Sequence, residues 1–251
     1  MRILSININD FGGINEHLMQ YKYFHNKLKR ECIDWRGWSK INKHAVLELF
    51  FDYLEEKRPD ILVVNEMLIS SFETIDFISE IMRKGYTYYH ENVPKGNYPF
   101  TMMFYKNVKY KLQKSPNENH RAYRSVLCEI GDILIYGTHF PQEGDSEFLK
   151  DVNDFYDVNK EKKLLIIGDL NANNPNRRNK PLVNMLIEKV AVDVWIAKGN
   201  LEDTPTEVHF KGRLDYAIST PALFDIIQHI QIDSHTIECG MTDHAAIIVE
   251  F

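Results

Sequence analysis

The stretch that decides the fold is Lys163-Leu164-Leu165-Ile166-Ile167-Gly168-Asp169-Leu170-Asn171. Its apolar run, Leu164–Ile167, is too short for an ordinary helix and is typical of a strand buried on both faces. A glycine, a carboxylate and an amide follow the run directly. An apolar strand with polar groups at its end is a pattern that recurs along this chain.

Seven further short runs rich in Ile, Val, Leu and Tyr are predicted as strands. They are Arg2–Ile8, Ile61–Asn65, Thr101–Tyr105, Ser125–Ile130, Ile133–Thr138, Leu214–Ser219 and Ala246–Phe251. Gly131-Asp132 lies between two of them and predicts a hairpin turn. Helices are expected at Lys43–Lys57, Phe72–Lys84, Glu147–Asn159 and Pro181–Val190, and a helix with a loop within Asn15–Trp38. The alternation predicts one α/β domain over residues 1–251.

Composition excludes several classes of protein. The 251 residues carry 30 Lys and Arg against 36 Asp and Glu, a formal charge of −6, so the chain does not hold nucleic acid by bulk charge. Cys32, Cys128 and Cys239 have no metal-binding spacing and make a disulfide scaffold a poor expectation. We see no secretory signal and no apolar segment of membrane-spanning length, and therefore expect a cytoplasmic protein.

Polar side chains stand at the ends of the predicted strands. A single Asp, Asn or His in such a place is usually a turn, cap or core residue. Glu66 is harder to explain in that way, because a carboxylate at the end of an apolar strand is costly to bury unless it is paired or binds a metal. Strand ends converge in layered α/β domains, so we expect one common site. Its members are Asn7, Asn9, Glu66, His139, Asp169, Asn171, Asp215, Asp243 and His244.

Six motifs carry these residues in chain order: Ser5–Asn9, Val64–Glu66, Thr138–Phe140, Gly168–Asn171, Arg213–Tyr216 and Thr242–Ala245. Together they resemble the endonuclease/exonuclease/phosphatase superfamily, the metal-dependent phosphoesterases that include deoxyribonuclease I and exonuclease III. The resemblance covers nearly the whole chain. It implies a four-layer α/β sandwich of two packed, mostly antiparallel or mixed sheets flanked by helices. It also implies Mg²⁺ or Mn²⁺ as cofactor and hydrolysis of a phosphate ester.

The resemblance implies a role for each motif residue. Glu66 would be the first metal ligand, with Asn9 and Asp243 as the next candidates. Asp169 would orient or deprotonate the attacking water, while Asn7 and Asn171 hold that carboxylate or the phosphate oxygens.

Two histidines have implied roles of their own. His244 would pair with Asp215, whose carboxylate fixes the imidazole tautomer and favours its charged form. His139 would contact the phosphate or protonate the leaving group.

Basic and polar residues near the motifs are candidates for further phosphate contacts, although a solvated polar loop is an equally good interpretation for some of them. These candidates are Arg213, Arg177, Arg178, Arg124 and Gln142.

The favoured interpretation is a Mg²⁺-dependent endonuclease or exonuclease that hydrolyses DNA as a monomer. Gly212 stands where exonuclease III-like enzymes often have Trp, which weakens the abasic-site interpretation in particular. Two alternatives stay open. One is a phosphatase or phosphodiesterase acting on a small molecule or a phospholipid headgroup, and the other is a catalytically silent binding module.

Overall fold

The computed structural model describes residues 1–14, 43–88, 94, 96–142, 144–172, 179–208 and 212–251. The helix and loop expected within Asn15–Trp38 lie outside the described residues, as do Cys32, Arg177 and Arg178. Within the described ranges, twelve strands form two six-stranded sheets.

The first sheet has its one parallel pair at the centre. Its order is β11 (His229–Asp233), β12 (Ala246–Glu250), β1 (Arg2–Asn7), β2 (Ile61–Met67), β4 (Phe100–Tyr105) and β3 (Thr87–Tyr88). Strands β1 and β2 are parallel, and the other neighbours are antiparallel.

The second sheet repeats this arrangement. Its order is β5 (Lys111–Gln113), β6 (Ser125–Ile130), β7 (Ile133–His139), β8 (Lys163–Asp169), β10 (Asp215–Ser219) and β9 (Val192–Asp193). Only β7 and β8 are parallel among its pairs of described strands. The Gly131-Asp132 turn joins β6 to β7 as a hairpin, as predicted.

The strands are buried on both faces, which explains their continuous apolar runs. Alternate residues such as Ile3, Val63 and Leu165 form the core between the two sheets. The residues between them face outward and are covered by helices. Helices α3 (Lys43–Lys57) and α4 (Phe72–Arg83) cover the first sheet, and α5 (Ser146–Asn159) and α6 (Asn179–Glu188) cover the second.

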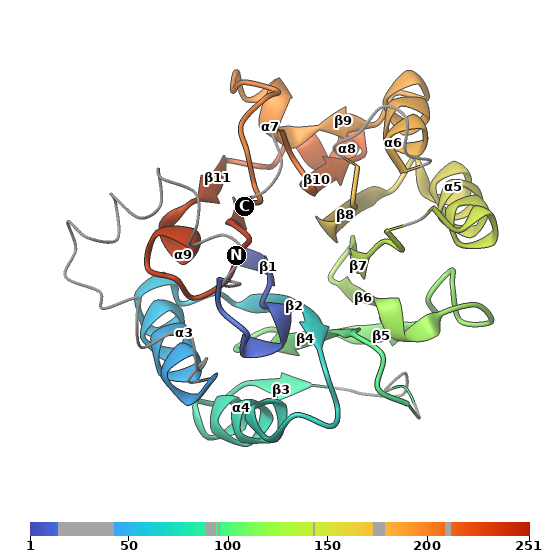
Figure 1. Cartoon of the computed structure of the whole chain (residues 1–251). Helices are drawn as coiled ribbons and strands as arrows, with labels where there is room; N and C mark the ends of the chain where they lie inside the picture. Colours follow the sequence, from blue (N-terminus) through green and yellow to red (C-terminus); the bar gives the residue numbers. More distant parts are fainter. Residues whose placement is uncertain (15–42, 89–93, 95, 143, 173–178, 209–211) are drawn as a thin grey trace.

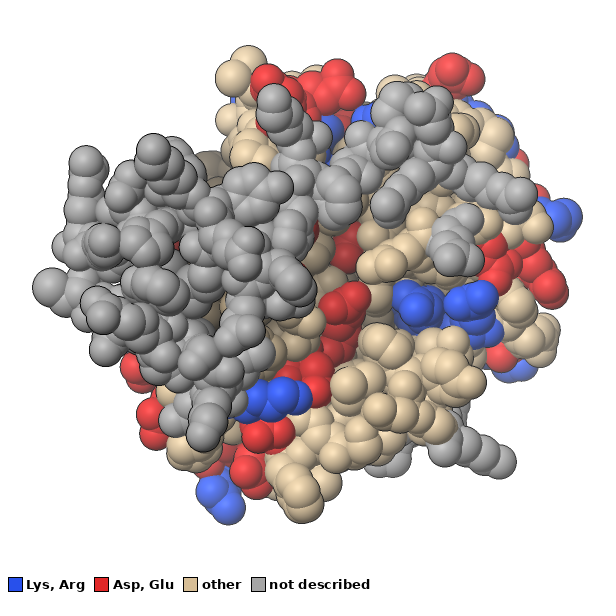
Figure 2. All heavy atoms as spheres, in the orientation of Figure 1, with Lys and Arg blue, Asp and Glu red and all other residues tan. Residues whose placement is uncertain are grey.

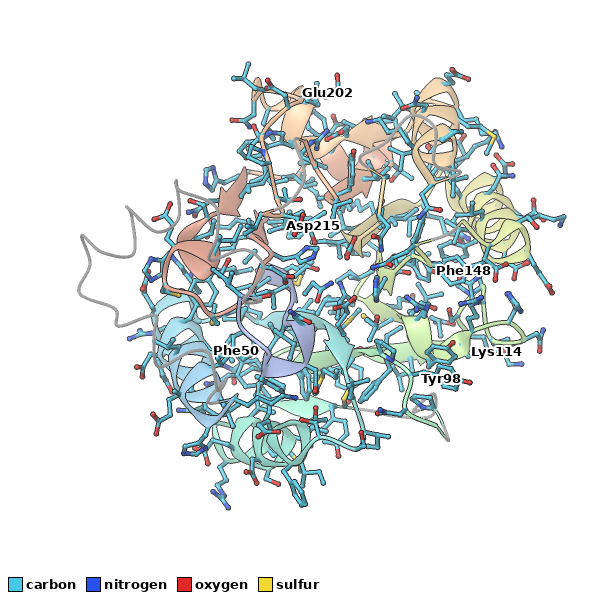
Figure 3. The ribbon with its side chains drawn as sticks, in the orientation of Figure 1. Phe50, Tyr98, Lys114, Phe148, Glu202 and Asp215 are labelled. Atoms are coloured by element: carbon cyan, nitrogen blue, oxygen red, sulfur yellow. The ribbon has the colours of Figure 1, made fainter. Side chains whose placement is uncertain are left out.

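Figure 1 shows these helix pairs on opposite outer sides of the molecule. In Figure 3, Phe50 of α3 and Phe148 of α5 lie in the two outer layers, with Asp215 between them. The four-layer α/β sandwich expected from the sequence is confirmed. No helix among the described residues is long and apolar enough to cross a membrane.

Two glycines set the close approach of the strands. A Cβ on Gly137 would lie 2.8 Å from a methyl group of Val63, so a side chain here would push the two sheets apart. A Cβ on Gly168 would lie 1.9 Å from the carbonyl oxygen of Thr138, and Gly168 has φ +144°. Only glycine therefore lets β8 pass β7 closely just before Asp169.

The predicted strands and long helices are confirmed, with ends that shift by one or two residues. The sequence interpretation missed the short elements. These are β3, β5, β9, β11, the helices α7 (Val194–Ala197), α8 (Pro221–Phe224) and α9 (His235–Glu238), and the 3₁₀ turns η1 (Asn9–Phe11) and η3 (Ala122–Arg124). All of these except β11 have only two to four residues, which are too few to show a period.

Candidate active site

Strand direction brings the polar strand ends to one edge of the sandwich. Parallel β1 and β2 place Asn7 beside Asn65, and parallel β7 and β8 place His139 beside Asp169. Antiparallel β10 begins at the same edge, where Asp215 lies opposite Asp169. Strand β12 is antiparallel to β1, so the residues that precede it arrive there too. Two sheets thus deliver side chains to one place, as the sequence predicts.

Glu66 is aimed into the site by an irregularity of its strand. The pairing of β2 with β4 shifts register between Val64 and Met67, and Glu66 has φ 60°. A β-bulge with left-handed backbone redirects a side chain at a cost of roughly 1–3 kcal/mol, which is typical of functional sites. The Glu66 Oε1 atom lies 3.4 Å from His139 Nε2, with 22% of the side chain exposed. Burial and then the neighbouring charge of Asp243 raise the pKa of Glu66.

Asp169 is the most enclosed carboxylate of the site, at 1% exposure. Its Oδ2 accepts a hydrogen bond from Asn7 Nδ2 at 3.0 Å, and its Oδ1 accepts one from the backbone N–H of Asn171 at 2.9 Å. The Oδ1 atom of Asn7 in turn accepts from the backbone N–H of Asn9 at 3.0 Å. Burial, and then the charge of Asp215, raise the pKa of Asp169. Asp169 is thus a fixed carboxylate with an increased affinity for a proton.

His244 and Asp215 form the pair that the resemblance implies. His244 Nδ1 lies 2.9 Å from Asp215 Oδ2, and His244 Nε2 lies 3.9 Å from Asp169 Oδ2. Burial opposes the charged imidazole, but the carboxylates of Asp215, Asp169 and Asp243 together outweigh it and raise the pKa of His244 well above its ordinary value. A cationic imidazole is therefore held with Nε2 facing the site.

His139 has a tautomer fixed by a neighbour. Arg124 donates from Nη1 to His139 Nδ1 at 3.2 Å, and because a guanidinium can only donate, Nδ1 must accept. The proton of the neutral ring then sits on Nε2, which faces Glu66 and Asp169 at 3.4 and 3.7 Å. Burial, followed by the charges of Arg124 and His244, lowers the pKa of His139. His139 is thus a neutral donor.

The donor set fits a hard divalent cation. Two groups of three side chains have ligand atoms within 4.8 Å of one another: Glu66 with His139 and Asp169, and Asp169 with Asp215 and His244. The carboxylate oxygens of Glu66, Asp169 and Asp215 are the ligands that Mg²⁺ and Mn²⁺ prefer, whereas the protonated Nε2 atoms of His139 and His244 are hydrogen-bond donors and not metal ligands. The raised pKa values of Glu66 and Asp169 point the same way, since a cation relieves the repulsion among these carboxylates.

The other two candidate metal ligands lie together beside this cluster. Asn9 Nδ2 is 3.5 Å from Asp243 Oδ2, and Asn9 and the two residues after it all have positive φ. The charge of Asp243 acts on Glu66, which places it near that carboxylate. Thr242 fixes this segment by donating from Oγ1 to the carbonyl oxygen of Asn7 at 2.7 Å.

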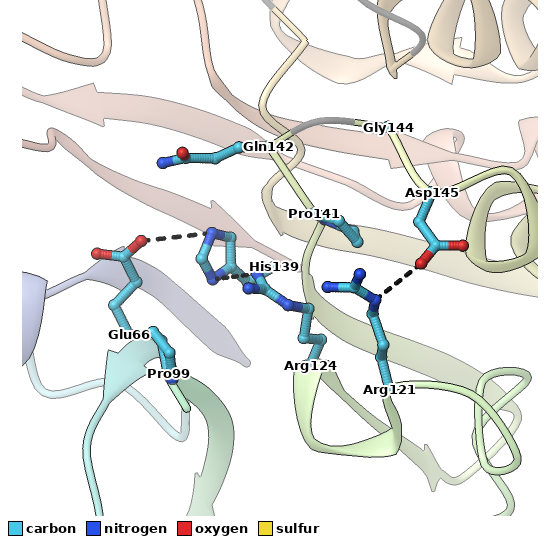
Figure 4. A pocket seen from close by; sticks show the side chains of 9 residues that line it. All are labelled: Glu66, Pro99, Arg121, Arg124, His139, Pro141, Gln142, Gly144 and Asp145. Atoms are coloured by element: carbon cyan, nitrogen blue, oxygen red, sulfur yellow. Dashed lines mark hydrogen bonds and ion pairs between the residues drawn. The ribbon is translucent and has the colours of Figure 1, made fainter. Parts of the chain in front are cut away.

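A cavity of about 690 Å³ opens beside Glu66 and His139. Figure 4 shows its lining, which consists of Glu66, Pro99, Arg121, Arg124, His139, Pro141, Gln142, Gly144 and Asp145. Figure 2 shows acidic side chains in the hollow at the centre of this face and basic side chains on one rim. The predicted phosphate contacts Arg124 and Gln142 both line the cavity.

The side chains of Arg213 and Asn171 make their contacts outside the cluster, although the backbone N–H of Asn171 does hold the carboxylate of Asp169. Arg213 is 2% exposed and forms a bidentate ion pair with Asp193, with Nη–Oδ distances of 2.9 and 2.5 Å. Its guanidinium also lies 4.5 Å from the ring centre of Tyr216, so the contacts that the structure gives to Arg213 hold it in the core. The amide of Asn171 donates to the carbonyl oxygen of Phe140 at 2.9 Å and stabilises the loop after β8.

The sequence interpretation missed two parts of the site. Asn65 is fully buried, its Oδ1 accepts from Thr101, and its Nδ2 has no hydrogen-bond partner in the described part of the chain. The position of Asn65 next to Glu66 in the sequence was the one signal that could have indicated its place in the site. The ion pair of Arg121 with Asp145 also lines the cavity, and no sequence signal joins these distant residues.

Solved structures that are similar to this chain include nucleases and a phosphatase. A 3′ phosphatase from Neisseria, solved with a product DNA hairpin, has 13% identity and a TM-score of 0.66, covering 100% of this chain and 99% of its own. An AP endonuclease from Archaeoglobus fulgidus has 16% identity and a TM-score of 0.65 with the same coverage. The endonuclease domain of a telomere-specific non-LTR retrotransposon has 15% identity, a TM-score of 0.61, and coverage of 99% and 96%. No family model and no curated protein matches the sequence.

Proposed function

We propose that this protein is a divalent-metal-dependent phosphodiesterase, specifically a nuclease that hydrolyses DNA. One observation carries the proposal: the ends of six strands bring Asn7, Glu66, His139, Asp169, Asp215 and His244 into one cluster of carboxylates, amides and imidazoles. The fold shared with DNA-processing enzymes supports a nucleic-acid substrate.

The residues present suit Mg²⁺ or Mn²⁺, which Glu66 would hold with Asn9 and Asp243 beside it. The bound cation would neutralise the negative charge that develops on the phosphate oxygens. Asp169, oriented by Asn7, accepts a proton from the attacking water, which its raised pKa favours.

The two imidazoles act on the phosphate from different protonation states. Cationic His244, supported by Asp215, binds a phosphoryl oxygen through Nε2. Neutral His139 donates its Nε2 proton as a hydrogen bond to a second oxygen, because Arg124 occupies Nδ1. Donors of this kind, fixed before the reaction, stabilise charge in the transition state without reorganisation.

The test is a metal-dependence assay on supercoiled plasmid, single-stranded DNA, RNA and bis-p-nitrophenyl phosphate, with Mg²⁺, Mn²⁺ or EDTA. Cleavage of DNA that requires a divalent cation supports the proposal. Glu66→Ala, Asp169→Asn and His244→Ala should each abolish this activity and leave the circular dichroism spectrum intact. Glu129→Gln, at the far end of β6, is the matched control and should retain activity.

Other results of this assay would favour one of the two alternative functions or contradict a residue role. Cleavage of the small ester without any cut in nucleic acid would overturn the nuclease and favour a small-molecule phosphoesterase. No turnover of any substrate with either metal would instead favour a silent binding module. Full activity in the His244→Ala variant would contradict the role given to that imidazole.

A further inference from the structure

The cavity beside Glu66 and His139 extends to a second charged pair, Arg121 and Asp145 (Figure 4). The hydrolysis proposed above uses neither residue. The cavity volume of about 690 Å³ is far larger than one phosphate group needs, since a water takes about 30 Å³ of liquid volume. The cavity therefore has room for a part of the substrate next to the scissile phosphate.

Arg121 is held in a strained and specific position. Its φ of 56° lies in the left-handed region, which a residue with a side chain adopts only where the surrounding structure holds it there. Its Nε atom lies 2.8 Å from Asp145 Oδ2. Figure 4 shows the rest of the guanidinium turned toward Pro141 and the cavity. The ion pair thus uses one edge of Arg121 and leaves the other edge for a ligand.

Asp145 is a rigid anchor for this arginine. Its Oδ1 accepts hydrogen bonds from the backbone N–H groups of Glu147 and Phe148, both at 3.1 Å, and so caps helix α5. Its Oδ2 lies 2.7 Å from His120 Nε2. Burial opposes the charge, but the hydrogen bonds from His120 and Phe148 lower the pKa of Asp145 to about 2. Arg121 therefore pairs with a permanent charge fixed to the helix.

A second guanidinium faces the same cavity. Burial lowers the pKa of Arg124, and the neighbouring charge of Arg121 lowers it further. Arg124 Nε is buried and has no hydrogen-bond partner in the described ranges. Two cations that repel each other are both stabilised when anions bind beside them, as two neighbouring phosphates would. The basic rim in Figure 2 is in keeping with such a site.

We propose that Arg121, positioned by Asp145, binds the phosphate next to the scissile one, so that the enzyme selects substrates with two consecutive phosphates. The inference rests on the proposed function, because Glu66, His139 and Arg124 then define where the scissile phosphate lies. The ligand is a phosphate one nucleotide away, which either an internal strand phosphate or a terminal phosphate supplies.

The experiment measures binding of three thymidine dinucleotides by NMR titration in EDTA at neutral pH. The dinucleotides are TpT, pTpT with a 5′-phosphate and TpTp with a 3′-phosphate. Wild-type protein should bind one of the two phosphate-bearing forms about tenfold more tightly than TpT, since a charge-assisted hydrogen bond contributes about 1.5 kcal/mol. Which form is preferred tells on which side of the scissile bond the subsite lies.

Variants then assign the preference to Arg121. The dissociation constant of TpT divided by that of the preferred phosphate-bearing dinucleotide should fall toward one in Arg121→Gln. Asp145→Asn keeps an acceptor for the helix cap but not the charge, and should give an intermediate ratio. Arg83→Gln is the control, because Arg83 is exposed on α4 and pairs with Glu80. It should keep the wild-type ratio.

The outcomes separate this inference from the proposed function. Equal binding of all three dinucleotides by wild-type protein, or an unchanged preference in Arg121→Gln with a native NMR spectrum, overturns the inference. The same dinucleotides are then incubated with Mg²⁺ and followed for hydrolysis. A preference that depends on Arg121, in a protein that cuts neither these dinucleotides nor any nucleic acid of the metal-dependence assay, supports the subsite and overturns the nuclease.

Discussion

Replacing Asp215 with Asn tests the electrostatics of the site most directly, because it removes one charge and keeps the side-chain shape. The ion pair with His244 has an Nδ1–Oδ2 distance of 2.9 Å, and the two side chains are only 8% and 4% exposed. Removing one partner of a buried pair costs about 3 kcal/mol. For a chain of this size we therefore expect the melting temperature to fall by about 6–12 °C at pH 6.

The loss of stability should depend on pH in a defined direction. The folded-state pKa of His244 is raised, so its contribution is complete below the unfolded pKa of about 6.5. The contribution declines by about 1.4 kcal/mol per pH unit above that value, until the folded pKa is reached. The difference between wild type and Asp215→Asn should thus be largest at pH 6 and much smaller at pH 8.5.

The assay is urea unfolding of both proteins in EDTA at pH 6 and pH 8.5, with the His244 ring followed by NMR. The His244→Ala variant identifies the His244 signal. In wild type this signal should not titrate near pH 6.5, whereas in Asp215→Asn it should titrate at a lower pH than in wild type, because only the charges of Asp169 and Asp243 then oppose burial. A stability difference that is equal at both pH values, or a wild-type His244 with an ordinary pKa, refutes the reasoning.

Three further changes test the frame around the site. Gly168→Ala should destabilise the protein by about 4 kcal/mol in urea unfolding, because its Cβ would overlap the Thr138 carbonyl; a loss below 1 kcal/mol would contradict that packing. Arg213→Gln leaves the carboxylate of Asp193 without its ion pair and should lower the free energy of unfolding by about 3 kcal/mol, while the folded enzyme keeps its activity. A rise in KM at unchanged stability would instead indicate that Arg213 binds phosphate. The charge of Asp145 should contribute about 1 kcal/mol to stability, after screening by solvent, and Asp145→Asn should remove it. Wild type has this contribution above about pH 4 and loses it as the pH falls toward 2. A difference in stability between the two proteins that stays the same from about pH 4 to pH 2 would argue against this.

The central strands, and the polar residues at their ends that form the candidate site, were predictable because their signals are local. Ile133–His139 and Lys163–Asp169 are apolar on both faces and end in polar groups, so strand and site residue are visible in one short stretch. Edge strand β11 has a weaker signal, since His229 and Gln231 alternate with only two isoleucines. Its assignment depends on pairing with β12, which a single segment does not show.

The parts of the site that sequence reasoning missed depend on distant contacts. Arg213 stands inside a recognised motif, yet its guanidinium pairs with Asp193, twenty residues away. The tautomer of His139 follows from Arg124, and the position of Arg121 follows from Asp145. The residue type limits what a side chain can do chemically. Which of these roles it takes depends on its contact partners, and tertiary packing brings those partners together.

The place of β12 inside the first sheet, between β11 and β1, has a consequence for folding kinetics. This strand pairs with β1 from Arg2 with Glu250 to Ser5 with Ile247, so nearly the whole sequence lies between the two partners. Closing so long a loop is slow, because its entropy must be lost before the contacts form. Asp243 and His244 reach the cluster only with this pairing. Catalytic activity in a refolding experiment should therefore recover later than helix content, and serve as a reporter of the final assembly step.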